Sequence, residues 1–338
     1  MRLDAPGRPH LTYCTNIHAG ESWDEVRANL ERHVVAVKGR VAPDRPFGVG
    51  LRLSARAAET LAAPGAVDRL RTWLDAHGLY VFTINGFPYG AFHGTRVKEG
   101  VYLPDWADDA RVAYTDRLAL LLAGLLPDGV EGTVSTVPGG FRRPSADLGR
   151  MADGMLRHAA GLHRLRERTG RTIALALEPE PCCVMETVAD TVAFFEGRLF
   201  SKAARARFEA LTGLAGGEAE TALRRHLTVC FDACHMAVEF EPPAEALGAL
   251  AAAAIRIGKV QVSAGLEASL GGDDRAAIEA LRPFADGVYL HQVVERRGDR
   301  LVRYLDLPEA LAAAEGDREP REWRIHFHVP LVRERLGP

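Results

Sequence analysis

The sequence lacks the features that mark membrane, secreted and nucleic-acid-binding proteins. No apolar run approaches the roughly 20 residues that span a bilayer, and the first residues lack the apolar centre of a signal peptide. We therefore expect a cytoplasmic protein with no membrane insertion. The formal net charge is −3, so the basic excess of proteins that bind long nucleic acids is missing, and no nucleic-acid partner is expected.

Cysteine is scarce as well. The chain has five cysteines in 338 residues, without a repeated Cys-x-x-Cys pair, and it is too long to need disulfide bonds for stability. Reduced thiols are therefore expected. Four of them lie near the ends of predicted strands, where thiolates could join a zinc site, although buried inert cysteine is the commoner case. These four are Cys14, Cys182, Cys183 and Cys234.

Several nucleotide and hydrolase motifs are also absent. The sequence contains no P-loop and no Gly-x-Gly-x-x-Gly, so nothing in it indicates a nucleotide cofactor. It has no Gly-x-Ser-x-Gly elbow of a serine hydrolase. What remains is a chain with 47% hydrophobic and 26% charged residues, which is typical of a globular protein with a substantial core.

Short apolar or β-branched runs alternate with amphipathic helical stretches along the whole chain. The predicted strands are 11–17, 47–53, 79–87, 133–137, 172–178, 227–232, 255–263 and 323–329. Such alternation favours parallel strands, and eight of them predict an α/β fold of the (β/α)8 TIM-barrel type. A closed barrel uses this much chain as one unit, so we expect a single domain over residues 1–338.

Helix signals support the same alternation. Ser22 and Glu25 have the spacing of a capping box, which predicts a helix that begins there and ends near Lys38 and Gly39. The other predicted helices are 66–77, 108–126, 151–169, 187–196, 244–254, 274–281 and 308–314.

Two segments exceed a minimal barrel. Residues 201–225 indicate an extra helix interrupted by Gly216 and Gly217, and residues 287–305 indicate a β-hairpin around Arg297-Gly-Asp299. Both are predicted to be insertions. The hairpin leaves one alternative open, in which 288–294 replaces 255–263 as a barrel strand.

Polar residues stand at the ends of two apolar strands. Glu178 follows 172–177, and Asp232 with His235 follows 227–231. Because the carboxyl ends of parallel barrel strands meet at one mouth, these side chains could share a divalent metal. A structural ion pair is the alternative for Glu178.

These motifs resemble, in order and spacing, the metal-binding strands of the xylose-isomerase-like barrels, which include sugar isomerases, ketose epimerases and an endonuclease branch. The segments that carry this likeness are Leu177-Glu-Pro179, Phe231-Asp-Ala-Cys-His-Met236 and Lys259-Val-Gln-Val262. Other segments are similar to the EboE-type metabolite-traffic family, and they are Leu11-Thr-Tyr-Cys-Thr-Asn-Ile-His18 with Glu21-Ser-Trp23, Asn85-Gly-Phe-Pro-Tyr-Gly90 and Tyr289-Leu-His-Gln292. This narrower likeness implies a sugar-isomerase-like enzyme linked to the processing or export of a metabolite.

The resemblance implies that Glu178 and Asp232 are metal ligands and that His235 contacts metal or substrate. The chain departs from the epimerase pattern at two positions. Gln261 stands where the family has a histidine, and it offers only a weak amide oxygen. His326 and His328 stand where the family has a glutamate; residues two apart share one face of a strand, so both can point inward as ligands.

The missing glutamate removes one of the two facing acid–base groups of ketose epimerases. Proton transfer on that side would need another group, such as His291, Glu180 or Lys259. His291 lies in an apolar run, so burial beside the core is its alternative role.

Substrate contacts are expected from loops that follow the strands. His18 and His93 follow the first and third strands, and Asn85 could hydrogen-bond a hydroxyl group. Arg142 and Arg143 follow a Gly-Gly pair and could hold a phosphate or carboxylate, although a solvated turn is the commoner case. The apolar composition of 86–106 indicates a lid over the mouth.

The sequence thus predicts a metal-dependent isomerase or epimerase that acts on a small polyhydroxylated, sugar-like or sugar-phosphate-like substrate through an enediolate. The metal could be manganese, magnesium, zinc or iron. Catalytic roles are expected for Glu178, His235 and His291. The alternatives are a zinc phosphodiesterase related to the endonuclease branch and a non-catalytic metabolite-binding barrel, and proteins of the same metabolite pathway are possible partners.

Overall fold

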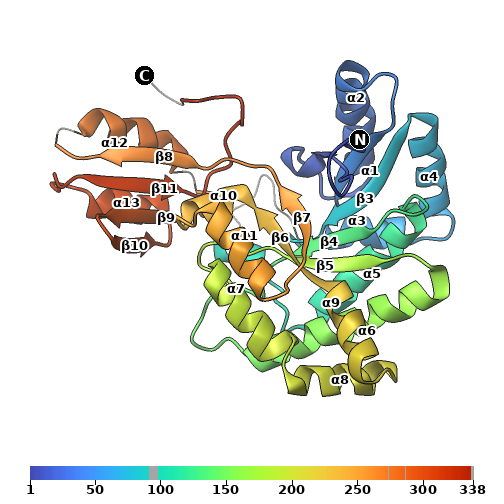
Figure 1. Ribbon diagram of the computed structural model, residues 1–338. Helices are drawn as coiled ribbons and strands as arrows, with labels where there is room; N and C mark the ends of the chain where they lie inside the picture. The colour runs from blue at the N-terminus through green and yellow to red at the C-terminus, as the bar shows by residue number, and fades with distance from the viewer. Residues whose placement is uncertain (91–97, 273, 286, 336–338) are drawn as a thin grey trace.

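The computed structural model describes residues 1–90, 98–272, 274–285 and 287–335 (Figure 1). Its strands form two sheets. A seven-stranded parallel sheet has the order β1-β2-β3-β4-β5-β6-β7, and a four-stranded antiparallel sheet has the order β10-β9-β11-β8. Figure 1 shows the smaller sheet to one side, with α10 and α11 between it and the bulk of the molecule.

The elements have the following bounds. The parallel strands are β1 (Thr12–Cys14), β2 (Phe47–Arg52), β3 (Leu79–Asn85), β4 (Gly132–Thr136), β5 (Ile173–Leu177), β6 (Leu227–Asp232) and β7 (Ile257–Gln261); the antiparallel strands are β8 (Leu266–Leu270), β9 (Val293–Arg297), β10 (Arg300–Tyr304) and β11 (Arg321–Ile325). The α-helices are α1 (Trp23–Asn29), α2 (Val35–Val41), α3 (Ala55–Leu61), α4 (Ala66–Ala76), α5 (Asp109–Leu125), α6 (Leu148–Thr169), α7 (Val188–Phe194), α8 (Lys202–Thr212), α9 (Gly216–His226), α10 (Ala233–Val238), α11 (Pro243–Ala252), α12 (Arg275–Leu281) and α13 (Leu307–Ala313). Shorter 3-10 segments are η1 (Thr15–Ile17), η3 (Lys98–Tyr102) and η5 (Arg282–Phe284), and π-helical turns are η2 (Leu30–Val34) and η4 (Phe195–Leu199).

Burial explains why the central parallel strands have nearly continuous apolar sequences. Every residue of β2, β4, β5 and β6 is buried, because one face lines the inside of the curved sheet and the other is covered by helices. β5, with the sequence Ile-Ala-Leu-Ala-Leu, is the clearest case. The carboxyl ends of these strands therefore meet at one mouth, as in other barrels of this type.

The predicted α/β fold with parallel strands in barrel order is confirmed, and seven of the eight predicted barrel strands are present in this order. The prediction for 323–329 is wrong in one respect. The strand there, β11, pairs antiparallel with β8 and β9 in the smaller sheet. β8 was not predicted; its alternating exposure marks a strand with one solvated face. The choice of 255–263 over 288–294 as a barrel strand is confirmed by β7.

Both predicted insertions are confirmed. Residues 201–225 form α8 and α9, which are separated by a break at Gly213 and Gly216 with positive φ angles of 77° and 55°. Residues 287–305 contain the hairpin of β9 and β10, whose turn includes Gly298 at φ 55°. The capping box at Ser22 and Glu25 is also present, with both reciprocal bonds formed.

The smaller sheet has its own apolar core. Trp323, Val293 and Leu307 are fully buried there, and α12 and α13 supply much of the surrounding apolar surface. A separate cluster joins this sheet to α10 through Cys234, Val238 and Val294. The single-domain organisation of residues 1–338 stays a prediction. Within the described residues, every helix is too short or too polar to cross a bilayer.

A buried histidine behind the parallel sheet makes the stability sensitive to acid. His226 ends α9, its Nδ1 lies 2.7 Å from the carbonyl oxygen of Ile173, and its Nε2 has no partner among the described residues. Burial lowers the pKa of His226 to about 4, below its usual 6.5. Its contribution to stability is therefore complete above pH 6.5 and is lost as the pH falls toward 4, because the unfolded chain binds the proton first.

We therefore expect the free energy of unfolding of the wild type to fall by up to about 3 kcal/mol more than that of His226→Gln between pH 7 and pH 4. Urea unfolding of both proteins across this range measures the difference. The other titrating groups contribute equally to the free energy of unfolding of the two proteins, so their contributions cancel in the difference. Equal pH slopes for the two proteins would contradict the assignment.

Candidate metal centre

Polar side chains from three separate segments converge at the mouth of the parallel sheet. They come from the loop after β5, from the end of β6 with α10, and from the segment after β11. The residues are Glu178, Glu180, Asp232, Cys234, His235, His326 and His328. All but His326 and His328 are buried.

Asp232 organises the centre from the end of β6. Its carboxylate caps α10, accepting bonds from the backbone N–H of Cys234 at 2.8 Å and of His235 at 3.3 Å. The hydroxyl of Ser263 donates to the same oxygen at 2.6 Å. The cap starts the short helix at the strand end and so places His235 beside its own carboxylate. The Asp-x-x-His pattern is thus a helix start that also brings a carboxylate and an imidazole together.

His235 and His326 both direct Nε2 toward the centre. The Nδ1 of His235 lies 2.8 Å from the carbonyl oxygen of Pro179, so Nδ1 is the protonated nitrogen and Nε2 has the lone pair. The Nδ1 of His326 lies 2.8 Å from Oε1 of Gln292. The rings of His235 and His326 meet edge to face with centroids 4.6 Å apart.

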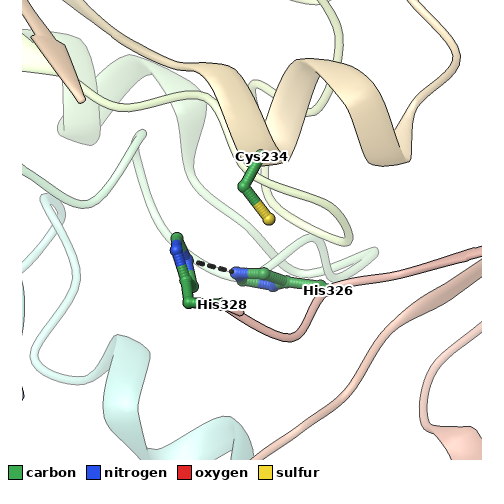
Figure 2. Close-up of side chains that lie close together, drawn as sticks. All are labelled: Cys234, His326 and His328. Carbon is green, nitrogen blue, oxygen red and sulfur yellow. Dashed lines mark hydrogen bonds between the residues drawn. The ribbon is translucent and has the colours of Figure 1, made fainter. Parts of the chain in front are cut away.

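His326 and His328 face each other across a short gap. Figure 2 shows the two rings with the thiol of Cys234 pointing toward them from α10. Their Nε2 atoms are 3.3 Å apart. A tetrahedral zinc ion with bonds of about 2.0–2.1 Å separates its nitrogen ligands by about 3.3 Å. The pair therefore has the spacing of two ligands of one metal ion.

Carboxylates lie on both sides of the imidazoles. Potential ligand atoms lie within 4.8 Å of one another in three groups: Asp232 with His235 and His328; Glu180 with His235 and His326; and Cys234 with His326 and His328. Three imidazoles with at least one carboxylate are a donor set that suits zinc and other first-row transition metals.

Charges within the centre compensate one another. Burial opposes protonation of His235, but the carboxylates of Asp232, Glu180 and Glu178 outweigh it and raise the pKa of His235. Burial would likewise raise the pKa of Asp232, but His235 and His328 outweigh it and lower that pKa. Burial, followed by the nearby histidines, lowers the pKa of His326 well below its usual value, so this ring is neutral and able to ligate a metal.

Glu180 is the most unusual carboxyl group of the centre. The hydroxyl of Tyr102 donates to its Oε1 at 2.8 Å, while Oε2 is buried and has no partner among the described residues. Burial raises the pKa of Glu180 to about 7. A buried oxygen without a partner beside two imidazoles fits a site that receives a metal or a substrate proton.

Two of the predicted ligands are arranged differently from the rest. Nε2 of Gln261 donates to Oε1 of Glu178 at 2.5 Å and to Oδ2 of Asp232 at 3.1 Å. The amide thus bridges the carboxylates of Glu178 and Asp232. The structure brings Asp232, His326 and His328 together, whereas the ligand roles of Glu178 and Gln261 stay predictions.

The remaining predicted site residues lie around this centre. His291 is buried, its Nδ1 is 3.3 Å from the carbonyl oxygen of His326, and its ring lies against Phe327. His18 lies away from the imidazoles, stacked on His33 with centroids 4.2 Å apart and 2.9 Å from the hydroxyl of Tyr13. His93 lies outside the described residues, as does part of the expected lid at 86–106.

The Gly-Gly-Phe-Arg-Arg segment does not present its first arginine as an open anion site. Arg142 is paired with Asp190 at 2.6 Å and Glu186 at 3.5 Å, and Arg143 is exposed. The N–H of Gly139 donates to the carbonyl oxygen of Val137 at 2.9 Å, and Gly140 is closely packed, since a Cβ there would lie 2.7 Å from Cβ of Asp105. The anion-binding role of Arg142 and Arg143 therefore stays a prediction.

A second polar group lies deeper in the mouth, on the side of β3, β4 and β7. The ammonium of Lys259 contacts Oδ1 of Asn85 and lies 3.0 Å from the hydroxyl of Ser135. Asn85 in turn donates to Asn16 at 2.7 Å. Among the described residues, the charge of Lys259 acts on Glu178, whose pKa it lowers against the larger effect of burial.

Sequence reasoning missed Tyr102, Gln292 and Ser263, which hold the ligands in place. Their roles depend on contacts between distant segments, and no local pattern marks them. Gln292 does follow His291 in a motif that was noticed, but its amide gave no sign of a role.

No protein-family model matches the chain, and no curated protein matches it. Among solved structures, the chain is similar to an L-ribulose 3-epimerase (17% identity, 83% of this chain and 79% of that chain, TM-score 0.43). It is also similar to the 3-keto-D-glucoside 4-epimerase YcjR from E. coli (17%, 90% and 96%, TM-score 0.40) and to the IOLI protein with a bound zinc atom (15%, 70% and 68%, TM-score 0.40). At these TM-scores, the fold and site rest on the residues of this chain alone.

Substitution distinguishes a metal site built on the imidazoles from one built on Glu178 and Gln261. We expect His326→Gln to weaken zinc binding by more than about 100-fold, because a lost ligand costs more than the 10–100-fold of a lost outer partner. Glu178→Gln should weaken it by less than about tenfold. Competition with a chromophoric chelator measures the zinc dissociation constants of both variants. The reverse order would place the metal between Glu178 and Gln261.

Proposed function

We propose that this protein is a metal-dependent isomerase or epimerase acting on a small polyhydroxylated metabolite. The observation that carries the proposal is the Glu180 carboxyl group. It has a buried oxygen without a partner and a pKa raised to about 7 by burial, and it lies within 4.8 Å of ligand atoms of His235 and His326. A group poised near neutral pH beside a metal centre suits transfer of a proton to and from carbon.

His235, His326 and His328 with Asp232 would hold the metal. This nitrogen-rich set favours zinc, manganese or iron over magnesium, which prefers oxygen ligands. The bound metal would polarise neighbouring carbonyl and hydroxyl oxygens of the substrate and make the adjacent C–H group more acidic. The chain itself supplies the groups that move the proton and orient the substrate.

Glu178 and Glu180 form the proposed acid–base pair. They flank Pro179 directly after β5, so the rigid proline fixes their relative placement. Burial raises the pKa of both carboxyl groups, with Glu178 held by the amide of Gln261 and Glu180 by the hydroxyl of Tyr102. Glu180 would therefore take the place of the second glutamate that the epimerase pattern has and this chain lacks.

Lys259 and Asn85 support an oxygen-rich substrate. The partners of the ammonium, Asn85 and Ser135, are neutral oxygen groups. Its charge is therefore available to a hydroxyl, carboxylate or phosphate oxygen of a ligand in the mouth. This favours a sugar or sugar-phosphate-like compound.

The EboE-type resemblance extends this proposal to cellular role. It supports a cytoplasmic enzyme that processes a metabolite before export, with proteins of the same pathway as partners. The sequence features behind this extension are Leu11-Thr-Tyr-Cys-Thr-Asn-Ile-His18 with Glu21-Ser-Trp23, Asn85-Gly-Phe-Pro-Tyr-Gly90 and Tyr289-Leu-His-Gln292.

The imidazole-rich centre also favours a second candidate, a zinc phosphodiesterase. Histidine and carboxylate ligands can hold zinc with an open position for a hydrolytic water. Cys234 beside His326 and His328 would add a donor for a further zinc ion. Two or more zinc ions per chain would support this candidate.

Hydrogen exchange tests the isomerase proposal. Metal-loaded protein incubated in D2O with a panel of ketoses and ketose phosphates should introduce deuterium beside the carbonyl group of its substrate. Glu180→Gln should lower this rate by about 100-fold or more while it retains the metal. The rate of the wild type should rise as the pH approaches 7, because deprotonation of Glu180 produces the base.

The matched control is Glu196→Gln, since Glu196 is exposed and far from the centre in sequence, and it should exchange at the wild-type rate. Absence of exchange with every ketose, together with cleavage of bis-p-nitrophenyl phosphate, would replace the isomerase by the phosphodiesterase. Ligand binding without either reaction would indicate a metabolite-binding barrel.

A further inference from the structure

Gln292 contacts three different parts of the candidate centre. It lies directly before β9 and is 1% exposed. Its Oε1 is 2.8 Å from Nδ1 of His326, and its Nε2 is 2.9 Å from the hydroxyl of Tyr102 and 3.2 Å from the carbonyl oxygen of Pro181. Its own carbonyl oxygen accepts the backbone N–H of His326 at 2.8 Å. One residue therefore holds both the backbone and the ring of His326.

The partners of Gln292 determine which way its amide points. The carbonyl oxygen of Pro181 can only accept a hydrogen bond, so the NH2 group must face it. Oε1 therefore faces His326, and because this oxygen can only accept, Nδ1 of His326 must carry the proton. The opposite amide orientation would place two carbonyl oxygens 3.2 Å apart in a buried place, at the cost of a lost hydrogen bond.

The same amide determines the direction of the bond to Glu180. Nε2 of Gln292 donates to the oxygen of Tyr102, so the hydroxyl hydrogen of Tyr102 is left for Oε1 of Glu180 at 2.8 Å. Tyr102 is itself buried. The chain of bonds thus runs from His326 through Gln292 and Tyr102 to Glu180, and every donor and acceptor in it is assigned. It leaves Oε2 of Glu180 as the oxygen without a partner.

We infer that Gln292 is a positioning residue that fixes His326 in the Nδ1–H tautomer and thereby presents the Nε2 lone pair to the metal. The inference rests on the proposed metal site, and it adds that the amide of Gln292 makes His326 able to bind the metal through Nε2. A histidine protonated on Nε2 cannot bind a metal through that nitrogen. A neighbour that accepts from the other ring nitrogen orients the ring and makes it a stronger ligand.

Gln292 also connects segments that are distant in the chain. Gln292 directly precedes β9 of the smaller sheet, whereas Tyr102 ends η3 and Glu180 lies in the loop after β5. The ligand His326 and the proposed base Glu180 therefore depend on the same amide. Loss of Gln292 should weaken metal binding without removal of any ligand.

Nitrogen-15 NMR of histidine-labelled, metal-free protein tests the tautomer directly. In the wild type, His326 should show a protonated Nδ1 and an unprotonated Nε2, with His326→Gln used to assign the signals. In Gln292→Leu, the signal should shift toward the Nε2–H tautomer, and zinc binding should weaken by about 10–100-fold. Gln292→Glu keeps an acceptor opposite Nδ1, and its second oxygen when protonated can donate to the carbonyl oxygen of Pro181, so this variant should retain the Nδ1–H tautomer.

Tyr102→Phe is the matched control for general disturbance of the network. It removes the bond to Glu180 but keeps Gln292 opposite His326, so the tautomer of His326 should stay as in the wild type. Thermal unfolding confirms that each variant is folded. A wild-type His326 with the proton on Nε2 would overturn the inference, as would a folded Gln292→Leu with unchanged tautomer and zinc affinity.

The tautomer is read in the metal-free protein, so this result is independent of the proposed function. A wild type that shows the Nδ1–H tautomer supports the positioning role even if no substrate turns over. A wild type that binds no zinc refutes the metal centre and, with it, the inferred role of Gln292 in metal binding.

Discussion

The docking of the smaller sheet against α10 is the contact on which the candidate centre depends. The guanidinium groups of Arg296 and Arg324 lie over the ring of Phe240, 4.5 and 4.1 Å from its centroid. Arg324 also donates to the carbonyl oxygen of Ala237 at 2.9 Å. Because β11 runs directly into His326 and His328, this packing sets where both imidazoles lie relative to His235. The candidate metal centre is thus built from residues of both the parallel sheet and the smaller sheet.

Burial of these polar and charged groups is tolerated because most of them have compensating contacts. The carboxylate of Asp232 is satisfied by two backbone N–H groups and a hydroxyl, and Nδ1 of His235 donates to the carbonyl oxygen of Pro179. Within the candidate centre, Oε2 of Glu180 has no partner among the described residues, whereas the Nε2 atoms of His326 and His328 are hydrogen-bonded to each other at 3.3 Å. A buried polar atom without a hydrogen-bond partner is common at functional sites, whereas elsewhere it lowers the stability of the fold.

The sequence predicted those features that local pattern determines. Apolar runs located all seven parallel strands, and the pair Ser22 and Glu25 located the first helix start. The spacing of Asp232 and His235 and of His326 and His328 located four residues of the centre. The prediction that β11 pairs within the parallel barrel sheet was wrong. Its pairing depends on contacts with β8 and β9, and no local sequence pattern indicates which sheet these strands join. The bridge that Gln261 makes between Glu178 and Asp232 depends in the same way on contacts across the mouth.

The central claim is that His235, His326 and His328 share one metal ion. X-ray absorption spectroscopy of the protein loaded with one equivalent of zinc tests it most directly, because imidazole rings give a characteristic outer-shell scattering. The account predicts about three imidazole nitrogens and at least one oxygen at about 2.0–2.1 Å. A site with one imidazole or none, or a zinc–sulfur distance of about 2.3 Å that shows Cys234 in place of an imidazole, would contradict it.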